Sequence, residues 1–287
     1  MGGFSLLSER SKISVPSIQL SKYRGWSERL EQTPRREHRR KVLILHPYSP
    51  HWLRFPGIGA GDSAAILGAD PDLSRSDILQ RKLMQIEKLE QSSPKWYDWR
   101  RGGIGASESA AILGCNPWQT REQIMAQKLG AFEQEGNADT RRGKELEPEA
   151  RKAYERQMGI PMLPLCGAHS RYPFIRASFD GVSRDGKTIL ELKCPKSKNH
   201  AEWQRNGVPD YYCIQVQHQL LVSGAERAHF ASYCLETPTG RRAKGPKLWI
   251  APTIYPDEEL HACLIRELSE FWEELCASRR QSPSQLP

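Results

Sequence analysis

The stretch Ala177-Ser-Phe-Asp180-Gly181-Val, followed by Lys187-Thr-Ile-Leu-Glu191-Leu-Lys193-Cys-Pro, decides the fold and the chemistry expected of this chain. Its apolar residues predict strands over about 174–178 and 188–193, and Asp180 is expected to follow the first strand at a glycine turn. Glu191 and Lys193 are two positions apart in the second strand, so their side chains share one face of it. A hairpin would bring the two acidic side chains together.

The paired acids point to metal chemistry. Two carboxylates without a neutralising partner repel each other, and a hard divalent cation with oxygen ligands resolves that repulsion. A lysine beside such an ion, here Lys193, can hold or help deprotonate an attacking water, which would complete a site for phosphodiester hydrolysis. Taken alone, the same pattern is more often an ordinary hairpin with a surface ion pair.

Strands and helices alternate along the rest of the chain. Helices are predicted over about 120–129, 141–158, 199–205, 211–223 and 256–277, and further strands over 228–235 and 248–255. Strands flanked by helices in the sequence indicate an α/β sandwich.

The chain contains an internal repeat at an offset of 46 residues. Residues 57–71 return as 103–117 with 11 of 15 positions identical, and a helix over 76–89 is predicted after the first copy. Only the second copy continues into the other motifs. We therefore interpret the first copy as a partial duplication, either a vestige or a competitor for the same place on the core, and its Gly61 stands where the second copy has Ser107.

Charge is distributed unevenly. The 287 residues carry a formal net charge of +8, of which +6 lies in residues 1–50, where ten Lys or Arg face four Glu. We expect this extension to be mostly disordered, and to be either a solvated tail or a non-specific attraction for phosphate. The expected organisation is an extension over 1–50, the partial duplication over 51–93 and the main domain over 94–287.

Several classes of protein are disfavoured. No apolar run approaches the about 18 residues of a membrane span, and the N-terminus lacks the features of a secretory signal, so a cytoplasmic protein without membrane contact is expected. Seven cysteines without a Cys-x-x-Cys pair argue against a disulfide framework, a zinc ribbon or an iron–sulfur site. We expect them to be reduced and packed as small hydrophobic residues.

Other segments add candidate binding groups. Residues 103–107 tighten the chain before a predicted helix, an arrangement that can bind an anion, with Ser107 as its N-cap and Arg100 just upstream. Glu147 lies in a predicted helix that could turn it towards the sheet. Tyr212 and Gln215 share one helical face, where they could approach a phosphate. Each of these features alone is more often a capped helix or a solvated surface.

Together, the motifs resemble the phage-type recombination exonucleases, which include lambda exonuclease and the YqaJ-type viral recombinases. The motifs are, in order, Trp96-x-x-x-Arg100, Gly-Ile-Gly-Ala-Ser107-Glu108, Arg-Gly-Lys-x-x-Glu147, Ala-Ser178-x-Asp180-Gly, Leu-Glu191-Leu-Lys193-Cys-Pro and Tyr212-x-x-Gln215-Val-Gln217. The resemblance covers residues 94–235, about half of the chain. Phe179 departs from it, since a proline often precedes the aspartate in that family.

The resemblance implies an α/β fold with a restriction-endonuclease-like core, in which helices flank a mixed central sheet. It implies an exonuclease domain over 94–287 that uses two Mg²⁺ or Mn²⁺ ions, degrades one strand of duplex DNA from its 5′ end and leaves single strand for recombination. It also implies assembly as a homotrimer around double-stranded DNA ends and work with a single-strand annealing protein. The alternatives are a related nuclease of different polarity or substrate and a non-catalytic DNA-end-binding protein.

The resemblance also assigns residues to roles. The metal ligands would be Asp180, Glu191, Glu147 and the backbone carbonyl of Leu192, and Lys193 would position the attacking water, so the catalytic set is Asp180, Glu191, Lys193 and Glu147. The terminal 5′-phosphate would be received by Arg100, Ser107 and Ser178, and the lining helix would contribute Tyr212 and Gln215.

Overall fold

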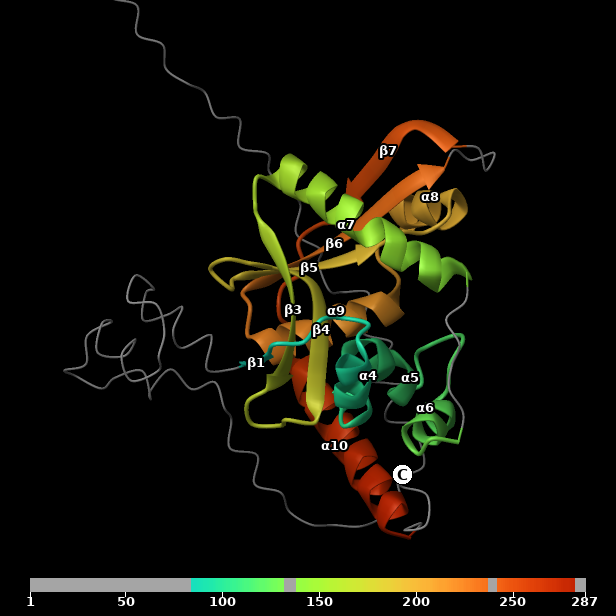
Figure 1. Ribbon diagram of the computed structural model, residues 1–287, viewed down its shortest axis with the longest axis vertical. Helices are drawn as coiled ribbons and strands as arrows, with labels where there is room; N and C mark the ends of the chain where they lie inside the picture. The colour runs from blue at the N-terminus through green and yellow to red at the C-terminus, as the bar shows by residue number, and fades with distance from the viewer. Residues whose placement is uncertain (1–83, 132–137, 237–241, 282–287) are drawn as a thin grey trace, which may run out of the picture.

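A seven-stranded sheet organises the part of the chain that the structure describes, in the order β1-β3-β4-β5-β6-β7 with the short β2 beside β4 (Figure 1). This computed structural model describes residues 84–131, 138–236 and 242–281. The strands are β1 (Met84–Glu87), β2 (Ile104–Gly105), β3 (Met162–His169), β4 (Ile175–Ser183), β5 (Thr188–Lys193), β6 (Arg227–Glu236) and β7 (Arg242–Ile250). The β2–β4 and β5–β6 pairs are parallel, and the other pairs are antiparallel.

Helices cover both faces of the sheet. They are α4 (Pro94–Arg101), the 3₁₀ turn η3 (Ala106–Glu108), α5 (Ser109–Ile112), α6 (Arg121–Lys128), α7 (Ala138–Met158), α8 (Ser197–Asn206), α9 (Asp210–Ser223) and α10 (Glu258–Gln281). Figure 1 shows α7 in front of the sheet and α9 behind it. The expected mixed sheet flanked by helices is confirmed. None of the helices in the described ranges is both long and apolar enough to cross a membrane.

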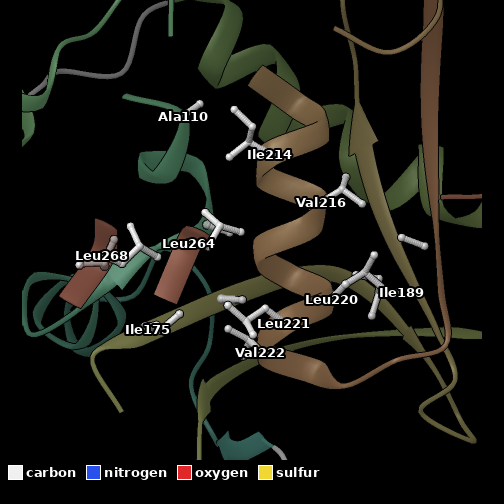
Figure 2. Close-up of a cluster of buried hydrophobic side chains, with 14 of the residues drawn as sticks. Ala110, Ile175, Ile189, Ile214, Val216, Leu220, Leu221, Val222, Leu264 and Leu268 are labelled. Carbon is white, nitrogen blue, oxygen red and sulfur yellow. The ribbon is translucent and has the colours of Figure 1, made fainter. Parts of the chain in front are cut away.

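The larger core lies around α9, which is packed between the sheet and α10 (Figure 2). Ile214 and Leu220 of α9 are almost fully buried and belong to the same cluster as Ile189 of the sheet and Leu264 and Leu268 of α10. Burial of this many aliphatic side chains supplies the main driving force for folding. Because α9 is enclosed, the polar residues along it must find partners inside the protein.

The smaller core lies on the opposite face of the sheet, under α7. Ala150 and Tyr154 of α7 pack there with Leu190 and Leu192 of β5 and with Tyr233 of β6. Side chains alternate along β5, so this arrangement turns the residue between the two leucines towards α9. A charged residue is thereby directed into the protein interior.

The expected glycine turn after Asp180 is wrong. Asp180 and Gly181 both lie within β4, which continues to Ser183. A Cβ at Gly181 would lie 2.7 Å from the Cβ of Met162, so glycine is needed there for close packing of neighbouring strands. The turn between β4 and β5 instead contains Gly186, whose φ of 73° is in the left-handed region that favours glycine.

The predicted helix over 76–89 is also wrong where it is described, because Met84–Glu87 forms β1 and pairs with β3. This strand lies ahead of the domain boundary expected at residue 94. The β3 strand itself was not predicted, and β7 begins and ends earlier than the strand expected over 248–255. The predicted helices after residue 94 are confirmed with small shifts of their ends. The extension over 1–50 and the first copy of the repeat lie outside the described residues.

His218 makes stability depend on pH. It is fully buried on α9, with Nδ1 2.6 Å from the Ser109 hydroxyl and Nε2 3.0 Å from the Arg176 carbonyl oxygen. Burial lowers its pKa to about 4 from an ordinary 6.5. Between these values the unfolded chain binds a proton that the folded state excludes, so acid destabilises the fold, by about 2 kcal/mol at pH 5 for this group.

We therefore expect the melting temperature to fall between pH 7 and pH 5, and to fall less in His218→Gln, because glutamine does not titrate in this range. The measurement is thermal unfolding followed by circular dichroism at both pH values, with Ser109→Ala as a control that disturbs the same contact but keeps the imidazole. Equal shifts in the parent and in His218→Gln would contradict this role.

Candidate active site

Asp180 sits where β4 and β5 separate. The two strands are paired at Gly181↔Leu190 and Val182↔Ile189, and the register ends there. The amide of Leu192, two residues beyond Leu190 on β5, donates a hydrogen bond to Oδ2 of Asp180 at 2.6 Å. A carboxylate thus takes the place of a main-chain acceptor, which holds the acid at the fork between the strands.

Glu191 is the charged residue that β5 turns towards α9, and it is only 2% exposed. Its Oε1 accepts from Nε2 of Gln215 at 2.7 Å and from the Lys193 ammonium, while Oε2 accepts from Nε2 of Gln219 at 2.6 Å. The two glutamines are one turn apart on α9, and each donates a hydrogen bond to a different oxygen of the carboxylate. The expectation of unneutralised acids is therefore wrong for Glu191.

Lys193 contacts both Glu191 and α9. Its ammonium pairs with the Glu191 carboxylate and lies 4.9 Å from the centre of the Tyr212 ring. Burial by itself lowers the pKa of Lys193, but the charges of Glu191, Tyr212 and Asp180 and the hydrogen bond to Glu191 together outweigh it, so the pKa lies above its ordinary value. Lys193 is consequently a charged hydrogen-bond donor fixed beside the acids.

Glu147 reaches the same region from α7. Its carboxylate pairs with the Arg151 guanidinium one turn later, and Nε of Arg151 donates to the Asp180 carbonyl oxygen at 2.6 Å. Burial raises the pKa of Glu147, and the charge of Glu191 adds to this rise despite the opposing effect of Arg151. The structure thus brings the helix-borne acid close enough to interact with the strand-borne acids.

The electrostatics around Asp180 favour a cation. Burial raises the pKa of Asp180 well above its ordinary value, and the charges of Glu191 and Glu147 add to the rise. Within the described ranges, no three His, Cys, Asp or Glu side chains are already grouped as a metal centre. The oxygen donors of Asp180, Glu191, Glu147 and the Leu192 backbone nevertheless suit a hard divalent ion, which would relieve the repulsion that raises the pKa of Asp180.

A second cluster adjoins the acids. Nη2 of Arg100 donates to the Ser107 hydroxyl at 3.0 Å, and its guanidinium lies 4.8 Å from the centre of the Trp96 ring. The indole N–H of Trp96 donates to the Ser178 hydroxyl at 2.9 Å. Ser178 and Asp180 are two residues apart on one face of β4, about 7 Å along the strand. The three residues expected to receive a phosphate therefore lie together, next to the acids.

Ser107 is not the N-cap that the glycine-rich segment predicts. It lies inside η3, whose N-cap is Gly105, and the Gly105 amide donates to Oε2 of Glu108 at 2.7 Å. Burial by itself raises the pKa of Glu108, but the charges of Lys128 and Arg100 bring it below its ordinary value. An ionised carboxylate thus occupies the expected anion site, and the Arg100 guanidinium lies 3.7 Å from Oε1 of the same carboxylate.

Three side chains that the sequence reasoning assigned no role complete the site. They are Trp96, Arg151 and Gln219. Helical spacing offered a signal for two of them, because Arg151 follows Glu147 by four residues in α7 and Gln219 follows Gln215 by four in α9.

Comparison with known proteins finds a family that the region of this site resembles. Residues 95–226 match the YqaJ-like viral recombinase domain. This YqaJ-like region contains all of the site residues described above. The chain is also 32% identical over 108 residues to an uncharacterized protein, YqaJ, from Bacillus subtilis (strain 168). That alignment covers 37% of this chain and 31% of the relative, so the chain matches less than a third of the relative's length.

Solved structures extend the comparison to the fold. An alkaline exonuclease from Laribacter hongkongensis, LHK-Exo, matches with a TM-score of 0.56 and 29% identity over 68% of this chain and 100% of its own. The same enzyme in complex with dAMP matches with a TM-score of 0.55 and 28% identity over the same shares. The expected resemblance and the restriction-endonuclease-like core are thereby confirmed, and the likeness supports a nuclease.

Proposed function

We propose that this protein is a metal-dependent DNA exonuclease that hydrolyses phosphodiester bonds from the ends of duplex DNA in the 5′ to 3′ direction. The observation that carries the proposal is the fork between β4 and β5, where Asp180 accepts the Leu192 amide and the ion pair of the buried Glu191 with Lys193 lies next to it. This arrangement falls within the YqaJ-like region, in a fold shared with an alkaline exonuclease.

Each residue of the fork has a separate task. Asp180, Glu191, Glu147 and the Leu192 carbonyl would hold Mg²⁺ or Mn²⁺ ions, proposed to be two. When bound, the metal supplies Lewis-acid stabilisation of the phosphate and lowers the pKa of water. The Lys193 ammonium positions the attacking water and donates to developing negative charge. Gln215 and Gln219 hold both oxygens of Glu191, which fixes the orientation of that carboxylate.

Digestion of labelled DNA tests the proposal. Linear and closed circular duplexes, labelled at a 5′ or a 3′ end where they are linear, are incubated with the full chain in Mg²⁺ or in EDTA. We expect degradation of the linear duplex only, dependent on Mg²⁺, with early release of the 5′ label. Early release of the 3′ label would indicate digestion in the 3′ to 5′ direction. Binding without digestion would favour a non-catalytic end-binding protein.

Arg100→Ala is expected to raise the KM for ends that carry a 5′-phosphate by about tenfold, because one charge-assisted contact is lost, and to have little effect on 5′-hydroxyl ends. The measurement is the rate of digestion of the two duplexes as a function of DNA concentration. The neighbouring Arg101→Ala is the matched control, since Arg101 pairs with Asp98 on the exposed side of α4. An equal loss on both kinds of end would contradict the assignment of Arg100.

A further inference from the structure

Trp118 is displayed to solvent on a well-supported loop. Its side chain is 70% exposed, more than any other large hydrophobic residue that the structure describes. Oδ1 of Asn116 accepts the amides of Trp118 and Gln119 at 2.8 and 3.2 Å, and the Gln119 side chain donates to Gln127 of α6 at 3.0 Å. The loop between α5 and α6 is therefore hydrogen-bonded into place, and the indole has a defined position in water.

An unbroken row of aromatic rings joins Trp118 to the candidate active site. The ring centres of Trp118 and Tyr211 are 4.8 Å apart in a T-shaped contact, and those of Tyr211 and Tyr212 are 4.5 Å apart. The Tyr212 ring in turn lies 4.9 Å from the Lys193 ammonium. We call Trp118, Tyr211 and Tyr212 the aromatic row. It begins at an exposed indole and ends at the lysine proposed to position the attacking water.

We propose that Trp118 stacks on an unpaired base of the DNA strand whose phosphate lies at Lys193. This inference rests on the proposed function, because Lys193 sets where the strand enters. A nucleic acid strand offers both charged phosphates and flat bases, and aromatic side chains bind bases of any sequence through their π-faces. The T-shaped contact with Tyr211 leaves most of the indole uncovered, so a base can pack on it without displacing a side chain.

The first test measures DNA affinity without hydrolysis. The full chain is titrated in EDTA against a fluorescein-labelled duplex with a short single-stranded 5′ extension, and fluorescence anisotropy is followed. We expect Trp118→Ala to raise the Kd about tenfold and Trp118→Phe to restore most of the affinity, because phenylalanine retains a stacking face. Tyr255→Ala is the matched control, since Tyr255 is a 54% exposed aromatic residue outside the aromatic row, and it should bind like the parent.

The second test locates the base. Single nucleotides of the extension are replaced in turn by abasic sites, and the Kd is measured for the parent and for Trp118→Ala. We expect one position at which the abasic site weakens the parent about tenfold and leaves Trp118→Ala unchanged, since the two changes remove the same contact. Equal abasic penalties in both proteins at every position, or an unchanged Kd for Trp118→Ala, would overturn the proposal.

Further measurements separate the remaining outcomes. Thermal melting shows whether Trp118→Ala is folded. If it is not, the affinity of Trp118→Phe relative to the parent still tests whether a stacking face is what position 118 supplies. If Trp118→Ala alters sedimentation but not DNA affinity, the indole contacts a second protein chain and the proposal is wrong. If the parent does not hydrolyse linear DNA in Mg²⁺, the proposed function fails, while the abasic comparison in EDTA still decides the role of Trp118.

Discussion

Lys193→Ala is expected to lower kcat for linear duplex DNA on the order of 10²–10³-fold while changing the Kd for DNA much less. The ammonium is charged, only partly exposed and adjacent to the acids, so its contribution grows as negative charge develops in the transition state. Binding of the DNA backbone, by contrast, is shared among many contacts. The measurement is single-turnover digestion in Mg²⁺, with the Kd measured separately in EDTA.

Lys196→Ala provides the matched control for this variant. Lys196 lies three residues later, and its side chain is 62% exposed and pairs with Asp139 on the surface. Because removing Lys193 leaves a buried Glu191 without its cation, Lys193→Gln is measured alongside as a variant that retains a hydrogen-bond donor. A kcat close to that of the parent in either folded Lys193 variant would contradict the proposed role.

Asp180→Asn is expected to lower the rate of hydrolysis about 10³-fold or more. The same substitution is expected to raise the melting temperature of the metal-free protein. The pKa of Asp180 is raised in the folded state by burial and then by Glu191. Above the ordinary pKa of 3.8, the unfolded chain ionises more readily than the folded protein, so this carboxyl lowers stability at neutral pH. Asparagine removes the charge and keeps an oxygen that accepts the Leu192 amide.

Asp185→Asn is a control for which the opposite change in melting temperature is expected. Asp185 lies in the turn between β4 and β5, where burial opposes its ionisation but hydrogen bonds from Ser183 and Lys187 bring its pKa below the ordinary value. Its replacement should therefore lower the melting temperature slightly and leave activity intact.

Mg²⁺ should raise the melting temperature of the parent but not of Asp180→Asn, because ligand binding stabilises only a folded state that binds it. A melting temperature lowered by Asp180→Asn would contradict this account of the site.

Local pattern was sufficient where the apolar period of a segment or the glycine at its end was clear. The alternation in residues 188–193 predicts β5 with its correct ends, and glycines at 130, 159 and 224 mark where three helices end, each with a positive φ. Local pattern misassigned Met84–Glu87, because a run of four residues is a strand only when a partner is present, and that partner, β3, lies about 80 residues away. The turn predicted at Gly181 was wrong for a similar reason, since this glycine is required by close packing against Met162 on the neighbouring strand.

The sequence by itself determined the order of the motifs, the sharing of a strand face by Glu191 and Lys193, and hence the resemblance to a family of exonucleases. Only the tertiary structure decided what surrounds these residues. Gln219 reaches Glu191 across 28 residues of chain, and Trp96 reaches Ser178 across 82. Spacing along a chain specifies which side chains share a strand or a helix, whereas contacts between elements depend on how those elements pack. That packing brings the acids, Lys193 and Arg100 into one region.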